Sequence, residues 1–280
     1  MAMPARRGRG AAMTRPTLSI VILTWNSRPL LEGCLAALPA ATTPLAVETI
    51  VVDNGSGDDT GAFLARHPEL VVTRNARNRG VAPARNQGLR LARGEFLAFL
   101  DVDTVAAPGA FAALVGELRA SPDVGLVGPK LVGSDGTLQY SCRRFPTLLD
   151  KLLRRLPERW GRSVAEDVEL RAWDHASVRD VDYVIGACQV MRRAALDEVG
   201  LLDERIFYGP EDVDLCLRMQ RAGWRVRYVP YAVVAHLERR VTRKLLSMLT
   251  LRHAHGLGYF FWKHRYLLTR PTIAVARRAA

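Results

Sequence analysis

Leu18-Ser-Ile-Val-Ile-Leu-Thr24 is a continuous apolar segment rich in β-branched residues, which is typical of a strand buried on both faces of a parallel sheet. Val47-Glu-Thr-Ile-Val-Val-Asp53 and Glu95-Phe-Leu-Ala-Phe-Leu100 have the same character. Segments with helical spacing lie between them, at Pro29–Leu38 and Ala82–Ala92. Strands and helices that alternate at this short spacing predict an α/β domain built on a parallel sheet.

The same alternation continues along the chain, less regularly. We expect a helix at Pro108–Ala120 and strands at Val124–Val127, Val181–Met191 and Trp224–Val229. Residues 134–180 hold several charged residues and predict a mixed extension of the domain. Ligands of open parallel sheets bind beyond the carboxyl ends of the strands, so polar residues at those ends are the first candidates for a site.

The charge of the chain lies at its two ends. The 280 residues include 40 Lys or Arg and 28 Asp or Glu, for a formal net charge of +12. Residues 1–16 carry four Arg, and residues 239–280 carry ten Lys or Arg, with no acid in either segment. We predict a disordered basic tail (1–16), a folded domain (17–238) and a basic amphipathic C-terminal extension (239–280). Basic ends favour an anionic partner. A membrane surface is a candidate, whereas no nucleic-acid motif is present and we expect no nucleic-acid partner.

No apolar segment reaches the roughly 18 residues needed to span a bilayer. Leu18–Trp25 also lacks the small-residue cleavage site of a signal peptide. The four cysteines form no CxxC pair, which argues against a zinc site or a disulfide framework. We therefore expect a cytoplasmic protein, with peripheral attachment to the inner face of the plasma membrane as the membrane-bound alternative.

Residues 240–268 mix Leu, Phe, Trp and Tyr with Lys, Arg and His. Helical spacing there would place an apolar face beside a basic one. Two interpretations stay open. In one, this segment lies on a membrane leaflet near its acceptor. In the other, it packs on the domain as a helix and leaves 269–280 as a loose tail.

Asp101 and Asp103 stand at the carboxyl end of a predicted strand. Two carboxylates one residue apart can hold a hard divalent cation such as Mg²⁺ or Mn²⁺, which would neutralise a diphosphate. A polar turn before a helix fits the same residues, so the spacing alone leaves both interpretations open. Thr24, Asn26 and Asp53 lie at the ends of two other predicted strands, although Asp53 also begins a turn-forming Asn-Gly-Ser segment.

Two further clusters carry candidate chemistry. Arg85 and Asn86 follow the loop at Asn78-Arg-Gly80, where Arg85 could meet a phosphate. Glu211 and Asp212 open an amphipathic helix, where acidic residues are favoured by the helix dipole alone. Such a carboxylate can also act as a general base that takes a proton from an attacking hydroxyl.

Taken in order, these motifs resemble the family 2 glycosyltransferases, which have the GT-A fold, and within them the bacterial rhamnosyltransferase-like branch. The likeness covers roughly residues 17–268 and implies a mostly parallel central sheet flanked by helices, with a C-terminal helical extension. The matching segments are Leu18–Asn26, Val47–Ser56, Asn78–Asn86, Phe99–Thr104 and Gly209–Arg218, supported by Arg143–Pro146, Gly186-Ala187, Met191–Arg193, Val199–Glu204 and Ala222–Trp224.

The resemblance implies a role for each candidate residue. Asp212 would be the catalytic base, with Glu211 supporting it. The nucleotide sugar would be bound by Thr24, Asn26, Asp53, Arg85, Asn86 and Asp101. The divalent metal, Mg²⁺ or Mn²⁺, would be bound by Asp101, Asp103 and His236.

The implied enzyme is an inverting glycosyltransferase of cell-envelope glycan synthesis. It would move a sugar, with rhamnose expected, from a nucleotide-diphosphate donor (dTDP-rhamnose, or a UDP- or GDP-sugar) to a lipid-linked or polysaccharide acceptor. The alternative is a non-catalytic protein that binds a nucleotide sugar or an anionic polymer. A dinucleotide oxidoreductase is disfavoured because Trp25-Asn-Ser-Arg-Pro29 follows the first strand in place of Gly-x-Gly-x-x-Gly.

Overall fold

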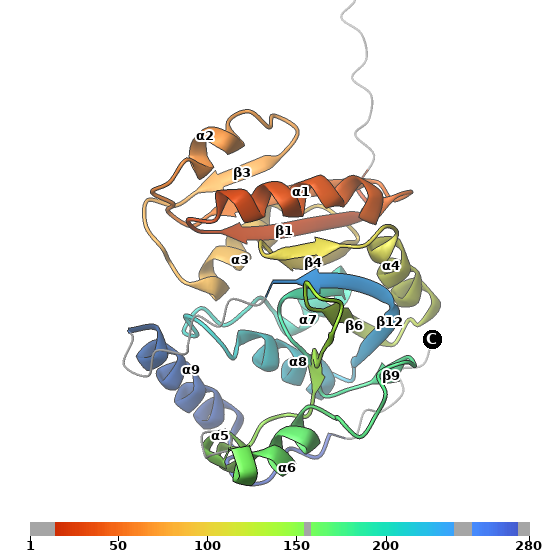
Figure 1. Ribbon diagram of the computed structural model, residues 1–280, viewed down its shortest axis with the longest axis vertical. Coiled ribbons are helices and arrows are strands. Elements are labelled where there is room, and N and C mark those ends of the chain that lie inside the picture. The colour runs from red at the N-terminus through yellow and green to blue at the C-terminus, as the bar shows by residue number, and fades with distance from the viewer. Residues whose placement is uncertain (1–14, 154–157, 238–247, 274–280) are drawn as a thin grey trace, which may run out of the picture.

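The computed structural model describes residues 15–153, 158–237 and 248–273 (Figure 1). Nearly all of the predicted N-terminal tail lies outside these residues, as do 239–247 and 274–280 of the predicted extension. The helices are α1 (Arg28–Thr42), α2 (Thr60–Leu64), α3 (Val81–Leu91), α4 (Ala110–Ala120), α5 (Leu148–Leu153), α6 (Glu158–Val168), α7 (Arg193–Val199), α8 (Glu211–Arg221) and α9 (Met248–His264).

One large sheet runs through the molecule in the order β3-β2-β1-β4-β11-β6-β12-β5. Strands β1 to β4 pair in parallel, β11 runs antiparallel to both β4 and β6, and β6 pairs in parallel with β12. The sheet is therefore parallel in its first half, as predicted, and mixed beyond β4. Its main strands are β1 (Leu18–Thr24), β2 (Val47–Asp53), β3 (Val71–Arg74), β4 (Phe96–Asp101), β5 (Thr104–Ala106), β6 (Val124–Val132), β11 (Cys188–Arg192) and β12 (Arg225–His236).

Four two-residue strands complete the set. β7 (Leu138–Gln139) pairs with β6, and β9 (Arg179–Asp180) pairs with β12. β8 (Cys142–Arg143) and β10 (Tyr183–Val184) form a small separate sheet. The irregular composition of 134–180 thus corresponds to short strands and the helices α5 and α6, the mixed extension that the sequence predicts.

Both faces of the large sheet are covered, which explains why β1 is apolar throughout. Ile20 and Ile22 point to the core beneath α1 and α4, whereas Val21 joins the second core with residues of α3, α7 and α8. Alternating side chains of one strand therefore serve two cores. α3 packs closely on β1, because a Cβ on Gly88 would meet Val21 Cγ1 at 2.3 Å.

The structure corrects three strand boundaries. The predicted strand Val181–Met191 is two strands, β10 and β11, because the backbone of the intervening residues bonds elsewhere: Asp101 N–H donates to Ala187 O at 2.9 Å. The predicted strand Trp224–Val229 continues to His236, past an irregularity between Val229 and Val233. The third correction is β5 itself, which the sequence analysis did not predict and which lies between the turn at 102–103 and α4.

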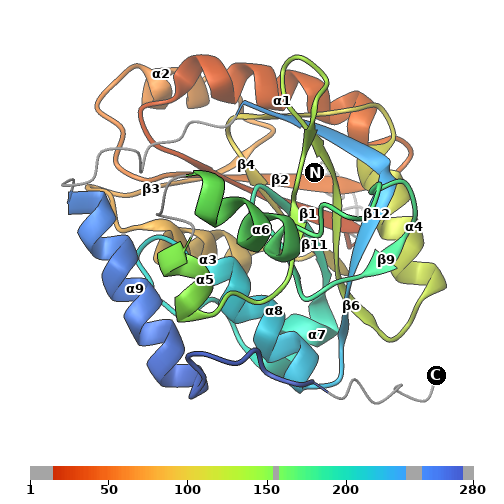
Figure 2. The same ribbon diagram turned by 60° about the horizontal axis from the view of Figure 1, so that its bottom comes forward.

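α9 packs on the body of the domain, on the side that also carries α5 and α8 (Figures 1 and 2). Phe260 and Phe261 are buried in the second core. Lys263 Nζ and His264 Nε2 bond to Asp214 Oδ1 of α8 at 2.6 Å and 2.8 Å. The packed interpretation of this segment therefore holds for the inner face of α9. None of the helices described in the structure is both long enough and apolar enough to cross a membrane.

Candidate functional site

The carboxyl ends of β1, β2 and β4 meet at one edge of the sheet. Thr24 is the register partner of Asp53, and Asp101 lies beside Leu23. The parallel pairing therefore brings together three of the predicted site residues from distant parts of the chain. The hydroxyl oxygen of Thr24 is buried there and has no hydrogen-bond partner, so a polar atom at this edge is left for a ligand.

Asp101, Asp103 and His236 form a three-residue cluster. One ligand atom from each lies within 4.8 Å of the others, and His236 Nε2 is 3.6 Å from Asp103 Oδ1. The antiparallel pairing of β5 with β12 produces this meeting, because it sets His236 opposite Thr104. Two carboxylates and an imidazole are donors that suit Mg²⁺ or Mn²⁺, so the residues present fit a divalent metal.

Gln139 of β7 holds His236 through two contacts. Its Nε2 donates to the His236 carbonyl oxygen at 2.8 Å, which fixes the orientation of the amide, and its Oε1 lies 2.9 Å from His236 Nδ1. Gln139 Oε1 is therefore placed to accept from Nδ1–H, and Nε2 faces Asp103. The sequence analysis missed Gln139, because it lies 97 residues from its partner in an irregular region and no local motif marks it.

Arg85 links the Asp101–Asp103–His236 cluster to the start of α8. The buried guanidinium donates to Asp101 Oδ1 at 2.6 Å and to Gly186 O at 2.8 Å, and lies 3.6 Å from Glu211 Oε1. Burial alone would lower the pKa of Arg85, but the charges of Asp101 and Glu211 outweigh it and raise the pKa. Arg85 therefore stays charged between two carboxylates.

Glu211 and Asp212 occupy the first turn of α8 and differ in environment. Asp212 is partly exposed, and its Oδ2 accepts a hydrogen bond from Gly186 N–H at 3.0 Å. Glu211 is buried, and its Oε2 has no hydrogen-bond partner. Burial, followed by the negative charge of Asp212, raises the pKa of Glu211. Asp212 is the more accessible carboxylate of the pair, so it is better placed than Glu211 to accept a proton from a substrate.

Asp53 lies at the opposite end of the site from α8. Its Oδ1 accepts from Ser56 N–H at 2.9 Å, and its Oδ2 forms an ion pair with Arg74 Nε at 3.0 Å. Asn26 has a φ of +49°, and its Oδ1 accepts from Gly57 N–H at 2.8 Å. These contacts tie the loops after β1 and β2 to each other, so both loops form one wall of the site.

Asn86 plays a different part in this structure. Its Nδ2 donates to Leu202 O at 2.9 Å and Glu204 Oε1 at 3.0 Å, and its Oδ1 accepts from Leu202 N–H at 3.1 Å. The buried amide thus fastens α3 to the segment before α8. Of the predicted residues, Asn86 is the one whose side chain is fully engaged in holding two elements together.

Comparison with known proteins gives the family of this chain. The pattern "Glycosyl transferase family 2" matches residues 19–200. The N-acetylglucosaminyl-diphospho-decaprenol L-rhamnosyltransferase of Mycobacterium tuberculosis is 32% identical over 262 residues, covering 89% of this chain and 85% of that protein. The pre-mycofactocin glycosyltransferase of the same organism is 34% identical over 207 residues, 72% of this chain but 40% of that protein.

A solved structure agrees with this result. The mannosyltransferase PcManGT from Pyrobaculum calidifontis, in complex with GDP-Man and Mn²⁺, has a TM-score of 0.61 and 24% identity, and the match covers 92% of this chain and 67% of that one. At this level of identity the similarity is evidence for the fold alone, and it confirms the predicted GT-A fold. The chain belongs to family 2 of the glycosyl transferases, and it is a glycosyltransferase with a rhamnosyltransferase among its relatives.

Proposed function

We propose that this glycosyltransferase moves rhamnose from a nucleotide-diphosphate donor, dTDP-rhamnose, to a lipid-linked diphosphate acceptor in cell-envelope glycan synthesis. The observation that carries the proposal is the likeness to the mycobacterial rhamnosyltransferase, which extends over most of both chains. That protein, by its name, acts on an N-acetylglucosaminyl-diphospho-decaprenol. The metal-binding cluster and the exposed carboxylate of Asp212 are the features of this chain that such a transfer requires.

Asp212 is the proposed catalytic base. It takes the proton from the acceptor hydroxyl as the hydroxyl oxygen bonds to the anomeric carbon of the sugar. The bond from that carbon to the donor diphosphate breaks, and the nucleoside diphosphate leaves. A single base on the face opposite the leaving group makes this a direct displacement, so the anomeric configuration inverts. Gly186 N–H holds Asp212 Oδ2 and so orients the carboxylate.

Asp101, Asp103 and His236 are the proposed metal ligands, and Gln139 orients His236 among them. A divalent cation at this site would supply neutralisation of the charge that develops on the leaving diphosphate. Arg85 adds a permanent positive charge beside Asp101. Thr24, Asn26 and Asp53 are the proposed contacts of the nucleotide, with the unpartnered Thr24 hydroxyl as one hydrogen-bonding atom.

The test is binding of a donor panel to the full-length protein. We expect dTDP-rhamnose to bind more tightly than UDP- or GDP-sugars, and only with Mn²⁺ or Mg²⁺ present. Asp103→Ala should weaken metal-dependent binding at least a hundredfold, since a ligand is lost. Asp197→Ala, which removes an exposed acid on α7, is the matched control. Equal binding of all donors with EDTA would contradict both the sugar and the metal assignments.

We also propose that the protein attaches peripherally to an anionic membrane surface on the cytoplasmic side. The outer face of α9 exposes Leu251 and Trp262, with 61% and 73% of their surfaces accessible, and Leu268 follows the helix at 65%. An exposed apolar face on a strongly basic segment is suited to anionic lipid. Trp262→Ser should reduce sedimentation with phosphatidylglycerol vesicles severalfold, whereas unchanged sedimentation would count against this surface.

A further inference from the structure

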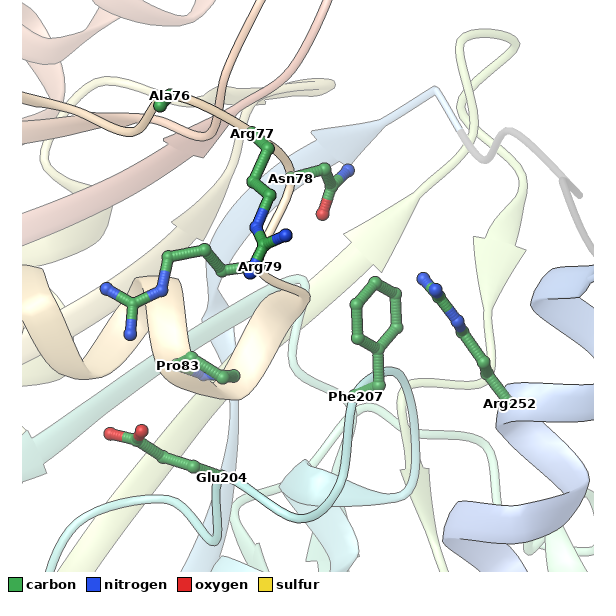
Figure 3. A pocket seen from close by; sticks show the side chains of 8 residues that line it. All are labelled: Ala76, Arg77, Asn78, Arg79, Pro83, Glu204, Phe207 and Arg252. Atoms are coloured by element: carbon green, nitrogen blue, oxygen red, sulfur yellow. The ribbon is translucent and has the colours of Figure 1, made fainter.

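A positively charged cavity lies beside the loop that precedes α3. Its volume is about 650 Å³. None of its lining residues is a proposed metal ligand or belongs to the loops after β1 and β2. The cavity nevertheless adjoins one wall of the proposed donor site, because Arg79 N–H donates to Asn54 Oδ1 at 3.0 Å and Asn54 Nδ2 donates to Asn78 Oδ1 at 3.1 Å. It is lined by Ala76, Arg77, Asn78, Arg79, Pro83, Glu204, Phe207 and Arg252 (Figure 3).

The lining carries excess positive charge. Arg77 and Arg79 enter from the loop before α3, and Arg252 enters from α9 on the other side of Phe207 (Figure 3). Within the described part of the chain, these three guanidinium groups form no ion pair. Glu204, the acidic residue of the lining, already forms an ion pair with Arg90, whose Nη2 lies 2.8 Å from Glu204 Oε1. The cavity therefore offers its arginines to an anion from outside.

The shape of the cavity is fixed before any ligand binds. Val81 N–H donates to Phe207 O at 2.7 Å, which joins the loop before α3 to the segment before α8. Gly80 has a φ of +92°, and a Cβ there would meet Phe207 O at 2.7 Å, so this contact requires glycine. The Arg252 guanidinium stacks on the Phe207 ring at 4.0 Å, which orients its N–H groups. A guanidinium oriented in this way, such as that of Arg252, lowers the entropy cost of binding.

A diphosphate diester matches this cavity. Each of its phosphates carries one negative charge, and planar guanidinium groups bind phosphate oxygens in pairs. Phe207 lies four residues before Glu211. Burial and then the charges of Glu211, Asp101, Asp212 and Asp103 raise the pKa of the next residue, Tyr208. This segment therefore lies near both the base and the Asp101–Asp103–His236 cluster. Leu251, exposed on the outer face of α9, neighbours Arg252 and offers an apolar surface to an attached lipid.

We propose that the cavity bounded by Arg77, Arg79 and Arg252 binds the diphosphate of the acceptor, and so selects acceptors in which a diphosphate joins sugar to lipid. This inference rests on the proposed function, which supplies a diphosphate-containing acceptor. The bound diphosphate holds the acceptor sugar near Asp212, and the lipid chain attached to the diphosphate extends along α9. Two diphosphates are then recognised separately, that of the donor at the metal-binding cluster and that of the acceptor at the arginines.

The test is equilibrium binding of farnesyl-diphospho-N-acetylglucosamine, a short-chain diphosphate diester, to the full-length protein in EDTA, which removes any metal-bridged binding at the donor site. Wild type should bind, and Arg77→Gln and Arg252→Gln should each weaken binding about tenfold, as expected for loss of one charge-assisted contact. Arg66→Gln removes an exposed arginine elsewhere and should bind as wild type does. UDP and dTDP should not displace the probe.

Several results would overturn the site. One is that the wild-type protein does not bind the probe. Another is that Arg66→Gln weakens binding as much as Arg77→Gln and Arg252→Gln do. A third is that UDP displaces the probe while the arginine variants show the same losses, which would assign the cavity to the donor. Because the measurement needs no turnover, it separates the two proposals. A protein that binds farnesyl-diphospho-N-acetylglucosamine here but fails to bind dTDP-rhamnose would lose its proposed donor and keep this site.

Discussion

The two halves of the large sheet are held together in different ways. The half from β3 to β4 is built from apolar parallel strands joined by nearby helices, and its register partners are pairs such as Leu18 and Val47. The half beyond β4 is also apolar inside, and it adds charged contacts between distant residues. Arg225 pairs with Asp123, 102 residues away, and Arg227 pairs with Glu117 at 2.7 Å, 110 residues away.

This difference coincides with a division of labour in the proposed mechanism. The first half supplies the proposed nucleotide contacts and Asp101, whereas the second half supplies Asp212, His236 and Gln139. Arg85 belongs to the first half by position on α3, and its contacts with Gly186 and Glu211 cross to the second. Substitutions in the second half should therefore change the rate of transfer or the metal affinity, while the proposed nucleotide contacts of the first half stay intact.

The largest effect is expected from Asp212→Asn, which removes the proposed base and keeps the shape of the side chain. Turnover should fall about a thousandfold, within the usual contribution of a general base. Donor binding measured with Mn²⁺ should stay within about twofold of wild type. Asp197→Asn serves as the control for loss of an acid in an exposed position. A comparable loss of donor affinity in Asp212→Asn would break the proposed division between the halves.

Asp214→Asn tests how far the second half depends on buried charge. Burial would raise the pKa of Asp214, but the hydrogen bond from His264 and the charges of Arg218 and Lys263 lower it to about 2. A folded-state pKa below the ordinary value of 3.8 stabilises the fold above that pH. The contribution, about 2 kcal/mol, is lost as the pH falls from about 4 to about 2.

Urea unfolding at pH 7, 4 and 3 measures this contribution as the difference in unfolding free energy between wild type and Asp214→Asn. The difference should be largest at pH 7 and smaller at pH 3, because below about pH 3.8 Asp214 takes up a proton in the unfolded chain, whereas in the folded protein it stays ionised down to a pKa of about 2. A difference that does not change with pH would mean that the ion pairs around Asp214 do not stabilise this half.

The smallest of the three effects is expected for Gln139→Met, which removes both contacts to His236 at similar side-chain length. Mn²⁺ affinity should fall about tenfold, the lower end of what loss of an orienting partner costs. Gln139→Glu keeps an acceptor for Nδ1–H and should retain more of the affinity. Manganese titration followed by electron paramagnetic resonance gives both constants directly. Equal affinity in all three proteins would mean that Gln139 does not orient the imidazole.

The first half of the fold could be read from the sequence because its signals are local. β1 and β2 have the predicted bounds, and β4 is shifted by one residue. Both faces of these strands are buried, so an uninterrupted apolar segment identifies them. The predicted strand Val181–Met191 failed for the opposite reason. The backbone of its middle residues forms hydrogen bonds with Asp212, Arg85 and Asp101, and no local sequence pattern predicts such contacts.

The site shows the same contrast. Asp53 and Asp101 follow apolar strands, and this position made them candidates, although only the resemblance to the family gave them roles. His236 was a candidate metal ligand only through the resemblance to the family. It lies near Asp103 because β5 pairs with β12, and no local pattern in the sequence predicts that pairing. Gln139 and the arginine-lined cavity depend on contacts across many residues, such as that of Arg252 with Phe207. Tertiary packing decides these features, and a single sequence carries no periodic signal for them.

The attachment of α9 to α8 also bears on how modular this enzyme is. The family pattern ends at residue 200, yet the buried Asp214 takes two of its partners, Lys263 and His264, from the last described helix. A chain shortened before α9 would leave that carboxylate with Arg218, at a cost that is typically several kcal/mol for a broken buried pair. We therefore expect the smallest autonomous unit to extend at least to His264. Transplanting only the family-defining segment into a hybrid enzyme would separate the base-bearing helix from the element that anchors it.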